Sequence, residues 1–532
     1  MAAYHLSQAS LKAAIKHLCR YGDTDVFPHL PELAFFAENS DAVVAELSKL
    51  DLNNYQPAGA VEVLAPKSRY GFRIAHQLPA LDTLLLLASV IEIGDQIEAR
   101  RQPVAARRAF SYRFALDPDS GQVFRQDRTF KDWLHRQQKL ISSDKKIKHV
   151  VSTDISDYYA RINFHRLENL LDEVAANHGA ARFIKKHIKT IRAKQSFGLP
   201  VGGAAARLLA ELALVDTDQA LRDRGLTATR FVDDFRIFLK AAESPYDALG
   251  SLAEQLAINE GLSLNAAKTS VSTRSQYIKR LKHLTSDVAE EAEGVALDTL
   301  TANLYFDEEP DEEDLAKLKT FNLVDLLQKE IDEDHWDMGR IKVIFRALKI
   351  TRPAESIKFV LKSFIALVVF AKEICLLMEE LEAEEVGCFD DILDEVIDAI
   401  LTPPASSVQI IRTWLLEIFV RGIIDISLVK LKRIEVLTTP TDRRQLLLIR
   451  GRGGDKNYFR KQKTAIHNFS DFEQPCLVWG ASCLPKDEYE KWIDTVKGSF
   501  NKPLGNLYLK WLATNRSKLT SKLKAITIDH PD

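Results

Sequence analysis

Hydrophobic positions recur every three or four residues through most of the first 110 residues, the spacing of helices that bury one face. The pattern is clearest over Leu6–Arg20 and Asp41–Leu52, and it predicts that residues 1 to about 110 are helical. It then changes at Phe110–Leu116 and Gly121–Phe124, which flank the turn signal Asp-Pro-Asp-Ser-Gly. We expect a strand, a turn and a strand there, followed by a helix at 128–142.

Strand-like and helix-like segments alternate between residues 147 and 273. The predicted strands are Ile147–Asp154, a hairpin over Leu226–Leu239, and Leu262–Leu264. The predicted helices are 163–176, 180–193, a long helix that ends near 224, and 245–260, with the glycine-rich segment Phe197–Gly203 before the long helix. Together they predict an α+β fold, a split α/β arrangement in which an antiparallel sheet is backed by helices.

The composition changes near residue 300. The segment Asp307–Asp314 is acidic apart from Pro310, and acidic residues and proline both favour the start of a helix. Almost everything from 315 to about 430 then has helical periodicity, with predicted helices at 315–330, 337–350, 354–384, 389–401 and 407–421. Helix pairs of similar length suggest an all-α array of the HEAT-like kind. We therefore divide the chain into a first domain at 1–295, an acidic linker at 296–314 and a helical domain at 315–532.

The composition is that of an ordinary globular protein. The 532 residues are 46% hydrophobic and 28% charged, which is enough for two or three domains with real cores. The net charge is −3, so any nucleic-acid-binding surface must be local. Five scattered cysteines without a Cys-x-x-Cys pair argue against a zinc site and fit a reducing cytoplasm. We expect no membrane association, because the chain begins without signal-peptide features and its longest apolar run, Phe364–Ala371, is too short to span a bilayer.

Two adjacent carboxylates, Asp233 and Asp234, fall at the tip of the predicted hairpin. Like charges side by side repel, so the pair is comfortable only when a cation lies between them, and Asp-Asp without glycine makes a poor two-residue turn. Asp154 ends another predicted strand. Carboxylates from two strand ends suit Mg²⁺, and two such ions could clamp the attacking and leaving oxygens of a phosphoryl transfer. The plainer interpretation is a polar hairpin tip and a helix N-cap.

The segment Asp-Ile-Ser-Asp-Tyr-Tyr, residues 154–159, suggests the floor of a nucleotide pocket. Ile155 would offer its backbone carbonyl to a metal ion. Tyr159 would lie under the incoming sugar, where its ring would clash with a 2′-hydroxyl and select deoxynucleotides. The alternative is a pair of core aromatic residues after a helix N-cap.

Two later motifs could complete such a pocket. Gly198, Pro200 and Gly202 would let the backbone approach a base pair between template and nucleotide closely. Lys268 could protonate the departing pyrophosphate. Singly, they could be a plain loop before a helix and a solvated lysine. All four motifs in one order, however, indicate a nucleic-acid polymerase.

The chain resembles reverse transcriptases. Residues 154–159 are similar to the family's first catalytic motif, 198–202 to its template- and nucleotide-positioning motif, 231–234 to its aromatic-x-Asp-Asp hairpin, and 261–269 to the next motif with its lysine. The resemblance implies fingers and a palm, with Asp154 and Asp233 as the main metal ligands, Asp234 as a third carboxylate and Tyr159 as the steric gate. It also gives Arg113 a fingers position that often contacts the triphosphate.

Within that family, the closest resemblance is to the abortive-infection (Abi) reverse transcriptases of bacterial anti-phage defence, of the prophage-encoded type. It is carried by the opening Lys-His-Leu-Cys-Arg-Tyr-Gly-Asp-Thr-Asp-Val-Phe-Pro at 16–28, by Ala206–Leu214, and by the helical C-terminal half. It covers 1 to about 290 by motif and the rest by architecture. It implies untemplated DNA synthesis primed from a protein side chain, a single-stranded DNA product attached covalently, and a homo-oligomer, either a trimer or a hexamer.

Two departures from the family pattern bear on template reading. Phe197 stands where many relatives have glutamine, and Ala-Ala-Ala follows Gly203 in place of Ser-Pro. Both changes fit a weakened reading of a template.

A basic stretch lies in the helical domain. Residues 430–463 hold eleven lysines and arginines against three acidic residues, so the stretch could bind a phosphate backbone, with aromatic rings stacking on bases. The candidate nucleic-acid-binding residues are Arg443, Arg444, Arg450, Arg452, Lys456, Tyr458 and Arg460. The alternative is an exposed helix face and a glycine-rich loop.

The sequence favours a DNA polymerase of reverse-transcriptase type that uses deoxynucleoside triphosphates with two Mg²⁺ or Mn²⁺ ions, in a bacterial cytoplasm. RNA-templated cDNA synthesis is the first alternative, and an inactive palm that binds nucleic acid as a scaffold is the second. A nucleotide cyclase fits less well, because it would not need the glycine-rich loop. Candidate priming tyrosines are Tyr4, Tyr21, Tyr458 and Tyr489, and the sequence ranks none of them.

Overall fold

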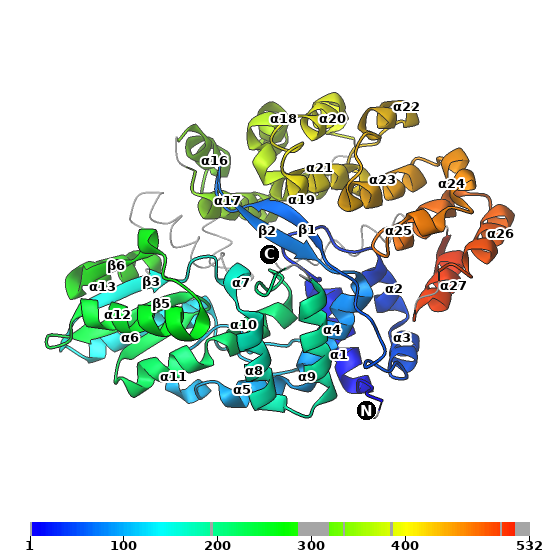
Figure 1. The fold of residues 1–532 in the computed structure, drawn as a ribbon. Helices are drawn as coiled ribbons and strands as arrows, with labels where there is room; N and C mark the ends of the chain where they lie inside the picture. The colour runs from blue at the N-terminus through cyan, green and yellow to red at the C-terminus, as the bar shows by residue number, and fades with distance from the viewer. Residues whose placement is uncertain are drawn as a thin grey trace.

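The computed structural model describes residues 3–191, 195–285, 319–333, 336–382, 387–500 and 503–516. Residues 3–285, here called the N-terminal half, carry both β-sheets (Figure 1). The described residues from 319 to 516, here called the helical half, form helices and no strand. The predicted linker at 296–314, with the domain boundaries beside it, lies outside the described residues.

The N-terminal half begins with helices, as the periodicity predicts, but it also contains a β-hairpin. The helices are α1 (Gln8–Tyr21), α2 (Glu32–Glu38), α3 (Ser40–Leu47), α4 (Ala80–Glu92) and α5 (Gly94–Arg100), and the hairpin strands are β1 (Val61–Pro66) and β2 (Phe72–Gln77). The prediction that the whole region is helical is therefore wrong. Val63 and Ala65 are buried while Glu62 and Leu64 are exposed, which is the period of a strand with one covered face.

The predicted strand–turn–strand at 110–124 forms only in part. The turn is present, since the Gly121 N–H donates to the Asp117 carbonyl (2.9 Å), but the flanking residues make a single bridge, Phe114 to Phe124, instead of two strands. Tyr112 has φ of 46°, which interrupts the extended backbone. The short 3₁₀ turn η1 (Val104–Ala106) precedes this segment, and α6 (Phe130–Ser143) follows it as predicted.

The main sheet has four antiparallel strands in the order β4-β5-β3-β6. They are β3 (Ile147–Asp154), β4 (Thr227–Phe231), β5 (Asp234–Lys240) and β6 (Ser270–Thr273). The predicted strand at Leu262–Leu264 is wrong: Leu264 makes only an isolated bridge to Ile155, and the strand forms at β6. The chain turns away from β3 at Asn265, because the Asn265 N–H bonds the Asp154 carbonyl (2.8 Å) and the Asn265 side chain caps the following 3₁₀ turn.

The remaining helices of this half are α7 (Tyr158–Arg161), α8 (Phe164–Ala175), α9 (Gly179–Ile191), α10 (Ala204–Ala213), α11 (Val215–Asp223), α12 (Pro245–Gln255), the π turn η2 (Leu256–Glu260), the 3₁₀ turn η3 (Ala266–Lys268) and α13 (Arg274–Thr285). α6, α11, α12 and α13 pack against the sheet, while α9 and α10 pack against α4 and α8. The predicted long helix to 224 divides at Leu214 into α10 and α11. The small side chains of α10 allow that helix to be buried along most of its length.

The helical half consists of α16 (Leu323–Asp332), α17 (Met338–Thr351), α18 (Glu355–Leu367), α19 (Ala371–Glu382), α20 (Leu393–Leu401), α21 (Gln409–Arg421), α22 (Leu428–Leu431), α23 (Pro440–Arg452), α24 (Lys456–Gln462), α25 (Gln474–Gly480), α26 (Lys486–Val496) and α27 (Gly505–Asn515). Short 3₁₀ turns connect several of them: η4 (Val368–Phe370), η5 (Asp390–Ile392), η6 (Lys432–Ile434), η7 (Ile466–Asn468) and η8 (Ala481–Cys483). The predicted helix 354–384 divides at η4 into α18 and α19.

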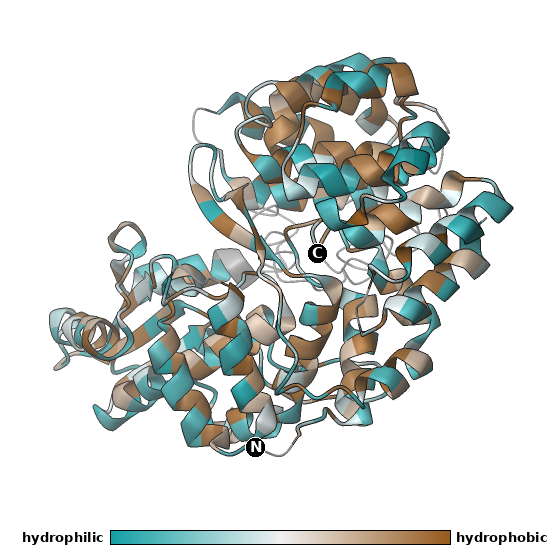
Figure 2. Ribbon diagram, turned by 45° about the vertical axis from the view of Figure 1, so that its right-hand side comes forward, coloured by the Kyte–Doolittle hydropathy of each residue, from teal (hydrophilic) through white to brown (hydrophobic). Residues whose placement is uncertain are grey.

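The helices of this half lie in two rows. α17, α19, α21, α23 and α25 pack one against the next to form an inner row, and α18, α20 and α22 lie outside it (Figure 1). From Ile410 to Arg421, α21 is buried on all sides, so it is the centre of this half. Hydrophobic and hydrophilic residues alternate in bands along these helices (Figure 2), the pattern of helices that bury one face.

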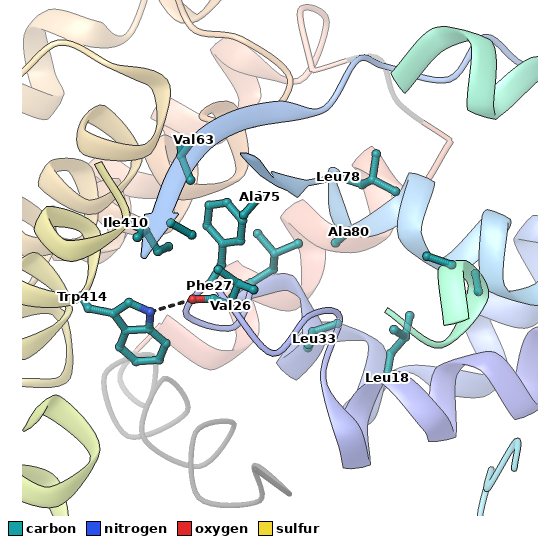
Figure 3. Packing of buried hydrophobic residues seen from close by; sticks show 14 of the residues in the cluster. Leu18, Val26, Phe27, Leu33, Val63, Ala75, Leu78, Ala80, Ile410 and Trp414 are labelled. Carbon is teal, nitrogen blue, oxygen red and sulfur yellow. Dashed lines mark hydrogen bonds between the residues drawn. The ribbon is translucent and has the colours of Figure 1, made fainter. Parts of the chain in front are cut away.

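The two halves share one hydrophobic core. Trp414 of α21 donates its indole N–H to the Val26 carbonyl (2.8 Å), and Phe27, Val63 and Ile410 pack around this contact (Figure 3). The β1–β2 hairpin lies between the halves (Figure 1). Truncating a buried tryptophan of this kind costs about 3–5 kcal/mol, so the placement of the two halves is firmly held.

Candidate active site

Asp154 and Asp234 lie opposite each other where two neighbouring strands meet. Asp154 is the last residue of β3, Asp234 is the first of β5, and the two are cross-strand partners in the antiparallel pair. The Ile155 N–H donates to the carbonyl of Asp233 (3.2 Å), which ties the third aspartate to the same place. The structure thus brings Asp154 together with the Asp233–Asp234 pair, which begins 79 positions later in the sequence.

The turn that presents Asp233 is held by buried polar side chains. Val232 has φ of 51°, which is unfavourable for a β-branched residue. Its N–H donates to the Ser111 hydroxyl (2.7 Å), and its carbonyl accepts from Arg230 (2.9 Å). Arg230 is fully buried and pairs with Asp218 (2.7 Å) and Glu211 (2.8 Å).

None of the residues in this supporting network was predicted from the sequence. The available signal was an arginine inside a strand and a glutamate inside a helix of small residues, since such charges are buried only when paired.

Lys268 reaches the aspartates from the turn η3. Its Nζ lies 2.7 Å from Oδ2 of Asp154, and the Thr153 and Thr269 hydroxyls, 2.7 Å apart, join the same two segments. Partial burial alone would lower the pKa of Lys268, but the hydrogen bond and the charge of Asp154 raise it. The lysine is therefore protonated at neutral pH.

The electrostatics of the site fit a cation. Burial, then Asp234, then Asp154 raise the pKa of Asp233 to about 7, which is what crowded carboxylates do without a counter-ion. Asp154 is 4% exposed, and its Oδ1 is buried without a hydrogen-bond partner. An orphaned carboxylate oxygen beside a second and a third carboxylate matches the hard oxygen donors that Mg²⁺ prefers.

The protein alone does not supply a finished metal site. Among the residues that the structure describes, no group of three or more His, Cys, Asp or Glu side chains is arranged to hold a metal ion, and the three aspartates are within that part. Mg²⁺ keeps several waters and binds through one or two carboxylates plus substrate phosphates. The arrangement therefore suits an ion that arrives with its nucleotide.

Ile155 and Tyr159 lie beside this strand end, as the sequence predicts. Ile155 is buried, and Tyr159 is half-buried in α7, with its carbonyl accepting from the Leu199 N–H (2.8 Å). Burial, with Tyr112 adding and Arg207 opposing, raises the pKa of Tyr159 well above its usual range. The ring is thus a neutral wall. Its contact with a sugar stays a prediction.

The glycine loop packs against the start of the chain. Gly198 and Gly202 have φ of 101° and 108°, a region that favours glycine. A Cβ on Gly202 would lie 2.3 Å from Oδ1 of Asp25 and 2.7 Å from Oγ1 of Thr24. Pro200 lines a small cavity with the same segment. The position of Gly202 is therefore covered by the protein itself, and the roles of Gly198, Pro200 and Gly202 toward a base pair stay predictions.

Arg113 lies in the protein interior. It is 2% exposed, and its guanidinium bonds Glu98 (2.7 Å) and the Gln102 carbonyl (2.9 Å). Burial, reinforced by the nearby Arg101, lowers its pKa to about 10. Contact with a triphosphate stays a prediction, and these interior hydrogen bonds argue against it.

The candidate residues of the basic stretch do not gather into one open patch. Arg444 is 2% exposed and bonds Gln77 (3.2 Å). The other arginines are paired with acidic side chains: Arg443 with Glu473, Arg450 with Glu435 and Asp455, Arg452 with Asp425, and Arg460 with Glu488. Lys456 is exposed, and Tyr458 lies half-buried under Arg450 (4.2 Å). Nucleic-acid binding by these residues stays a prediction, and the pairing argues against it.

Comparison with known proteins agrees with the site. Residues 107–292 match the family model described as reverse transcriptase (RNA-dependent DNA polymerase), and this stretch contains all three aspartates and Lys268. The chain thus contains a reverse transcriptase domain and is a nucleotidyltransferase. Domains of this family generally use divalent metal ions such as Mg²⁺ and bind nucleotides and nucleic acid.

Two solved structures are similar to a large part of the chain. Apo telomerase from Candida tropicalis has 13% identity and a TM-score of 0.33, covering 73% of this chain and 76% of that one. Telomerase from Candida albicans in complex with a fragment of telomeric RNA has 13% identity and a TM-score of 0.30, covering 71% and 70%. Both similarities are too weak to support an inference about this chain. No curated protein sequence matches it.

No helix in the described part of the chain has both the length and the apolar character needed to cross a lipid bilayer.

Proposed function

We propose that this protein polymerises deoxynucleotides at the three aspartates, with two Mg²⁺ or Mn²⁺ ions held by Asp154, Asp233, Asp234 and the Ile155 carbonyl. The observation that carries the proposal is the cross-strand pair of Asp154 and Asp234, with an orphaned oxygen on Asp154. Bound ions would polarise the attacking hydroxyl and offset the charge that develops on the phosphates.

The remaining steps belong to the protein's own side chains. Asp233, whose pKa is raised to about 7, would hold an ion in its deprotonated form. Lys268 is protonated and 62% exposed at its side chain, so it can leave Asp154 and donate a proton to the departing pyrophosphate. Tyr159 forms the wall beneath the sugar and excludes a 2′-hydroxyl.

We further propose that synthesis needs no template, starts from a protein side chain and serves anti-phage abortive infection in a bacterial cytoplasm. Two observations support the untemplated variant. Phe197 replaces the usual glutamine, and Asp25 and Thr24 cover Gly202, where a template base would otherwise meet the loop. Priming, defence and a trimer or hexamer rest on the resemblance to Abi enzymes. The two-row packing of the helical half supports a HEAT-like array.

A priming tyrosine must be reachable, so burial changes which tyrosines are candidates. Tyr489 is 1% exposed and bonds the Val478 carbonyl (3.1 Å), and the Tyr4 hydroxyl is buried. Tyr70 and Tyr246 are 81% and 87% exposed and join Tyr21 and Tyr458 as candidates. Peptide mapping of nucleotide-modified protein would identify the residue.

Intact-protein mass spectrometry after incubation with Mn²⁺ and deoxynucleotides tests the proposal. We expect a ladder spaced by nucleotide masses, absent in an Asp233→Ala, Asp234→Ala variant that keeps its thermal midpoint. Incorporation that persists in that variant would sink the assignment. RNA-templated cDNA synthesis is the competing activity, and product that appears only when an RNA template is added would replace the untemplated variant.

One observation favours a non-catalytic alternative, a palm that binds nucleic acid as a scaffold. The aspartates do not form a ready metal site, and Lys268 already neutralises Asp154. Titration of the protein with Mn²⁺ in the presence of a non-hydrolysable deoxynucleotide analogue separates the two. Absence of binding would favour the scaffold.

A further inference from the structure

A basic cavity of about 380 Å³ lies between the two halves of the protein. Its walls come from the segment at Asp25, the β1–β2 hairpin, α10, α17, α19 and α21. Among the residues that the structure describes, six basic side chains line it against two carboxylates, Asp25 and Glu373. The basic residues are Arg73, Arg207, Lys342, Arg346, Lys349 and Lys372.

The cations converge from separate elements on one carboxylate. Lys372 of α19 donates to the Asp25 carbonyl (2.9 Å), and Arg207 of α10 lies 3.6 Å from Oδ2 of Asp25. Burial alone would raise the pKa of Asp25, but Arg207, Arg73, Lys372 and Lys342 together lower it below its ordinary value. Asp25 thus occupies the centre of a positive field.

The two carboxylates do not balance this charge. Oδ1 of Asp25 is buried without a hydrogen-bond partner, and so is Nε of Arg73. The Lys342 ammonium lies 3.7 Å from the Glu373 carboxylate, and the Lys342 side chain is 48% exposed, so this ion pair is weak. Like charges around a partly enclosed space repel, and the low dielectric of the walls strengthens their field. A cavity of this size and sign is built for an anion larger than a single carboxylate.

The cavity adjoins the candidate active site. Asp25 lines it and packs against the glycine loop, since a Cβ on Gly202 would lie 2.3 Å from Oδ1 of Asp25. The Leu199 N–H of that loop bonds the Tyr159 carbonyl (2.8 Å). The Arg207 guanidinium, also in the wall, lies 5.1 Å from the centre of the Tyr112 ring. The half-buried Tyr112 ring thus borders the cations. An aromatic ring beside lysines and arginines is the kind of surface on which a single strand stacks a base and rests its phosphates.

We propose that this cavity binds the phosphate backbone of a single-stranded DNA segment next to the active site, so that the junction of the two halves guides the strand. The inference deepens the polymerase assignment and rests on it for the identity of the strand. The lysines of α17 and α19 pair with phosphates, and Asp25 opposes them. Because the site is built from both halves, it gives the helical half a direct part in handling nucleic acid.

The test measures binding, not synthesis. Fluorescence anisotropy follows a labelled oligodeoxythymidine on the full chain in EDTA, after nuclease treatment. The test variant is Lys342→Gln with Lys349→Gln, both on α17. The matched control is Lys358→Gln with Lys362→Gln, two exposed lysines of the neighbouring α18 that do not line the cavity. Both variants remove two charges from one helix, so net charge alone cannot separate them.

We expect the α17 variant to bind about tenfold more weakly or worse at 0.1 M salt. The slope of log affinity against log salt should fall by roughly 0.7 for each lysine, while the control stays near wild type. Asp25→Asn should bind more tightly, a gain that a loss of folding would not produce. Equal weakening in both lysine variants, or an unchanged affinity in the α17 variant, overturns the proposal.

A free triphosphate is the other source of the same phosphate chemistry. If titration with deoxythymidine triphosphate depends on Lys342 and Lys349 while oligonucleotide binding does not, the strand proposal is overturned. The polymerase assignment fails separately. If the wild-type protein incorporates no nucleotide but binds the strand through the two lysines, catalysis is refuted and the strand-binding role of the cavity stands. The Asp233→Ala, Asp234→Ala variant should still bind the strand.

Discussion

The Lys268 ammonium donates a hydrogen bond to Asp154, with Nζ 2.7 Å from Oδ2, across a separation of 114 residues. The pair forms because η3 returns the chain to the end of β3, where the Asn265 N–H bonds the Asp154 carbonyl (2.8 Å). In this position the lysine neutralises the carboxylate that a metal ion would need. Lys268 and the ion therefore compete for Asp154.

Replacing Lys268 should separate metal binding from catalysis. Lys268→Met removes the competitor, so calorimetric titration should show tighter Mn²⁺ binding without nucleotide. Incorporation should nevertheless slow by about 10²- to 10⁴-fold, because the proton donor is lost. Lys268→Arg keeps the charge but not a transferable proton, so its incorporation rate should fall while its Mn²⁺ affinity stays near that of wild type. Lys240→Met, on an exposed lysine at the end of β5, is the control. Weaker Mn²⁺ binding by Lys268→Met would contradict the competition.

Metal binding should depend on pH through Asp233. Its pKa near 7 means that a proton must leave when an ion binds at pH 6, whereas almost none leaves at pH 8.5. Mn²⁺ affinity should rise between these values and then level. Calorimetry in buffers of different ionisation enthalpy should count the released proton at pH 6, and Asp233→Asn should release none. Proton release that does not change with pH would contradict the raised pKa.

Asp233 should also make the stability of the metal-free protein depend on pH. The pKa of Asp233 is higher in the folded protein than the ordinary 3.8, so its contribution to stability is present below about pH 4 and is lost as pH rises toward 7. In EDTA, the thermal midpoint of Asp233→Asn minus that of wild type should therefore increase as the pH is raised from 4.5 to 7.5. Above that range the difference should stay constant.

Much of the site can be predicted from the sequence because its residues lie at strand ends. Short apolar runs predict β3 and β5, and Asp154 and Asp234 are the end residues of these strands. The β1–β2 hairpin cannot be found from the helical pattern that dominates the first 110 residues, since only Val61–Pro66 alternates clearly. Long-range partners are also hidden. Nothing in the sequence links Arg444 to Gln77, 367 residues apart, or brings α17 to Asp25.

The same limit explains the basic stretch. Counting eleven cations against three acids in 430–463 ignores acidic residues that the fold supplies from elsewhere, such as Glu473 and Glu488. The cavity shows the reverse case, since α17 supplies three of its cations and the other three come from β2, α10 and α19, far apart in the sequence. Local charge counts therefore locate electrostatic sites poorly when pairing is long-range.

Tyr159 should control the choice of sugar. Tyr159→Ala opens the space beneath the sugar and should lower discrimination against ribonucleotides by about 10- to 100-fold. Single-nucleotide incorporation with deoxy- and ribonucleotides measures the ratio. Tyr158→Phe is the matched control, since the Tyr158 hydroxyl donates to the Ala210 carbonyl within the core. It should cost about 1 kcal/mol of stability and leave the ratio unchanged. An unchanged ratio in Tyr159→Ala would rule out the gate.

Arg113 should stabilise the fold. Arg113→Met leaves Glu98 without its main partner in the interior, so it should cost about 3 kcal/mol and lower the thermal midpoint. The KM for deoxynucleotides should be unchanged in the folded variant. Arg125→Met removes a surface pair with Asp127 and should change stability by less than about 0.5 kcal/mol. A raised KM with unchanged stability would instead support the triphosphate contact that the resemblance implies.

Ser111 should act on catalysis through the turn that carries Asp233. Its hydroxyl accepts from the Val232 N–H (2.7 Å) while donating to Glu211, and Ser111 is fully buried. Ser111→Ala leaves a buried N–H unpaired, at a cost of about 1–3 kcal/mol, and frees Val232 from its φ of 51°. Asp233 should then move away from Asp234, so its pKa should fall toward the ordinary value.

The readout for Ser111 is the pH profile of Mn²⁺ binding. If Ser111 positions Asp233, then in Ser111→Ala the midpoint of proton release should shift to lower pH and the Mn²⁺ affinity should fall as well. Ser89→Ala is the control, because the Ser89 hydroxyl is equally buried but bonds the Leu85 carbonyl (2.7 Å) within its own helix. Loss of stability in both variants with no shift of the profile in either would mean that Ser111 only stabilises the fold. A shift confined to Ser111→Ala ties the strained turn to the acidity of the catalytic carboxylates.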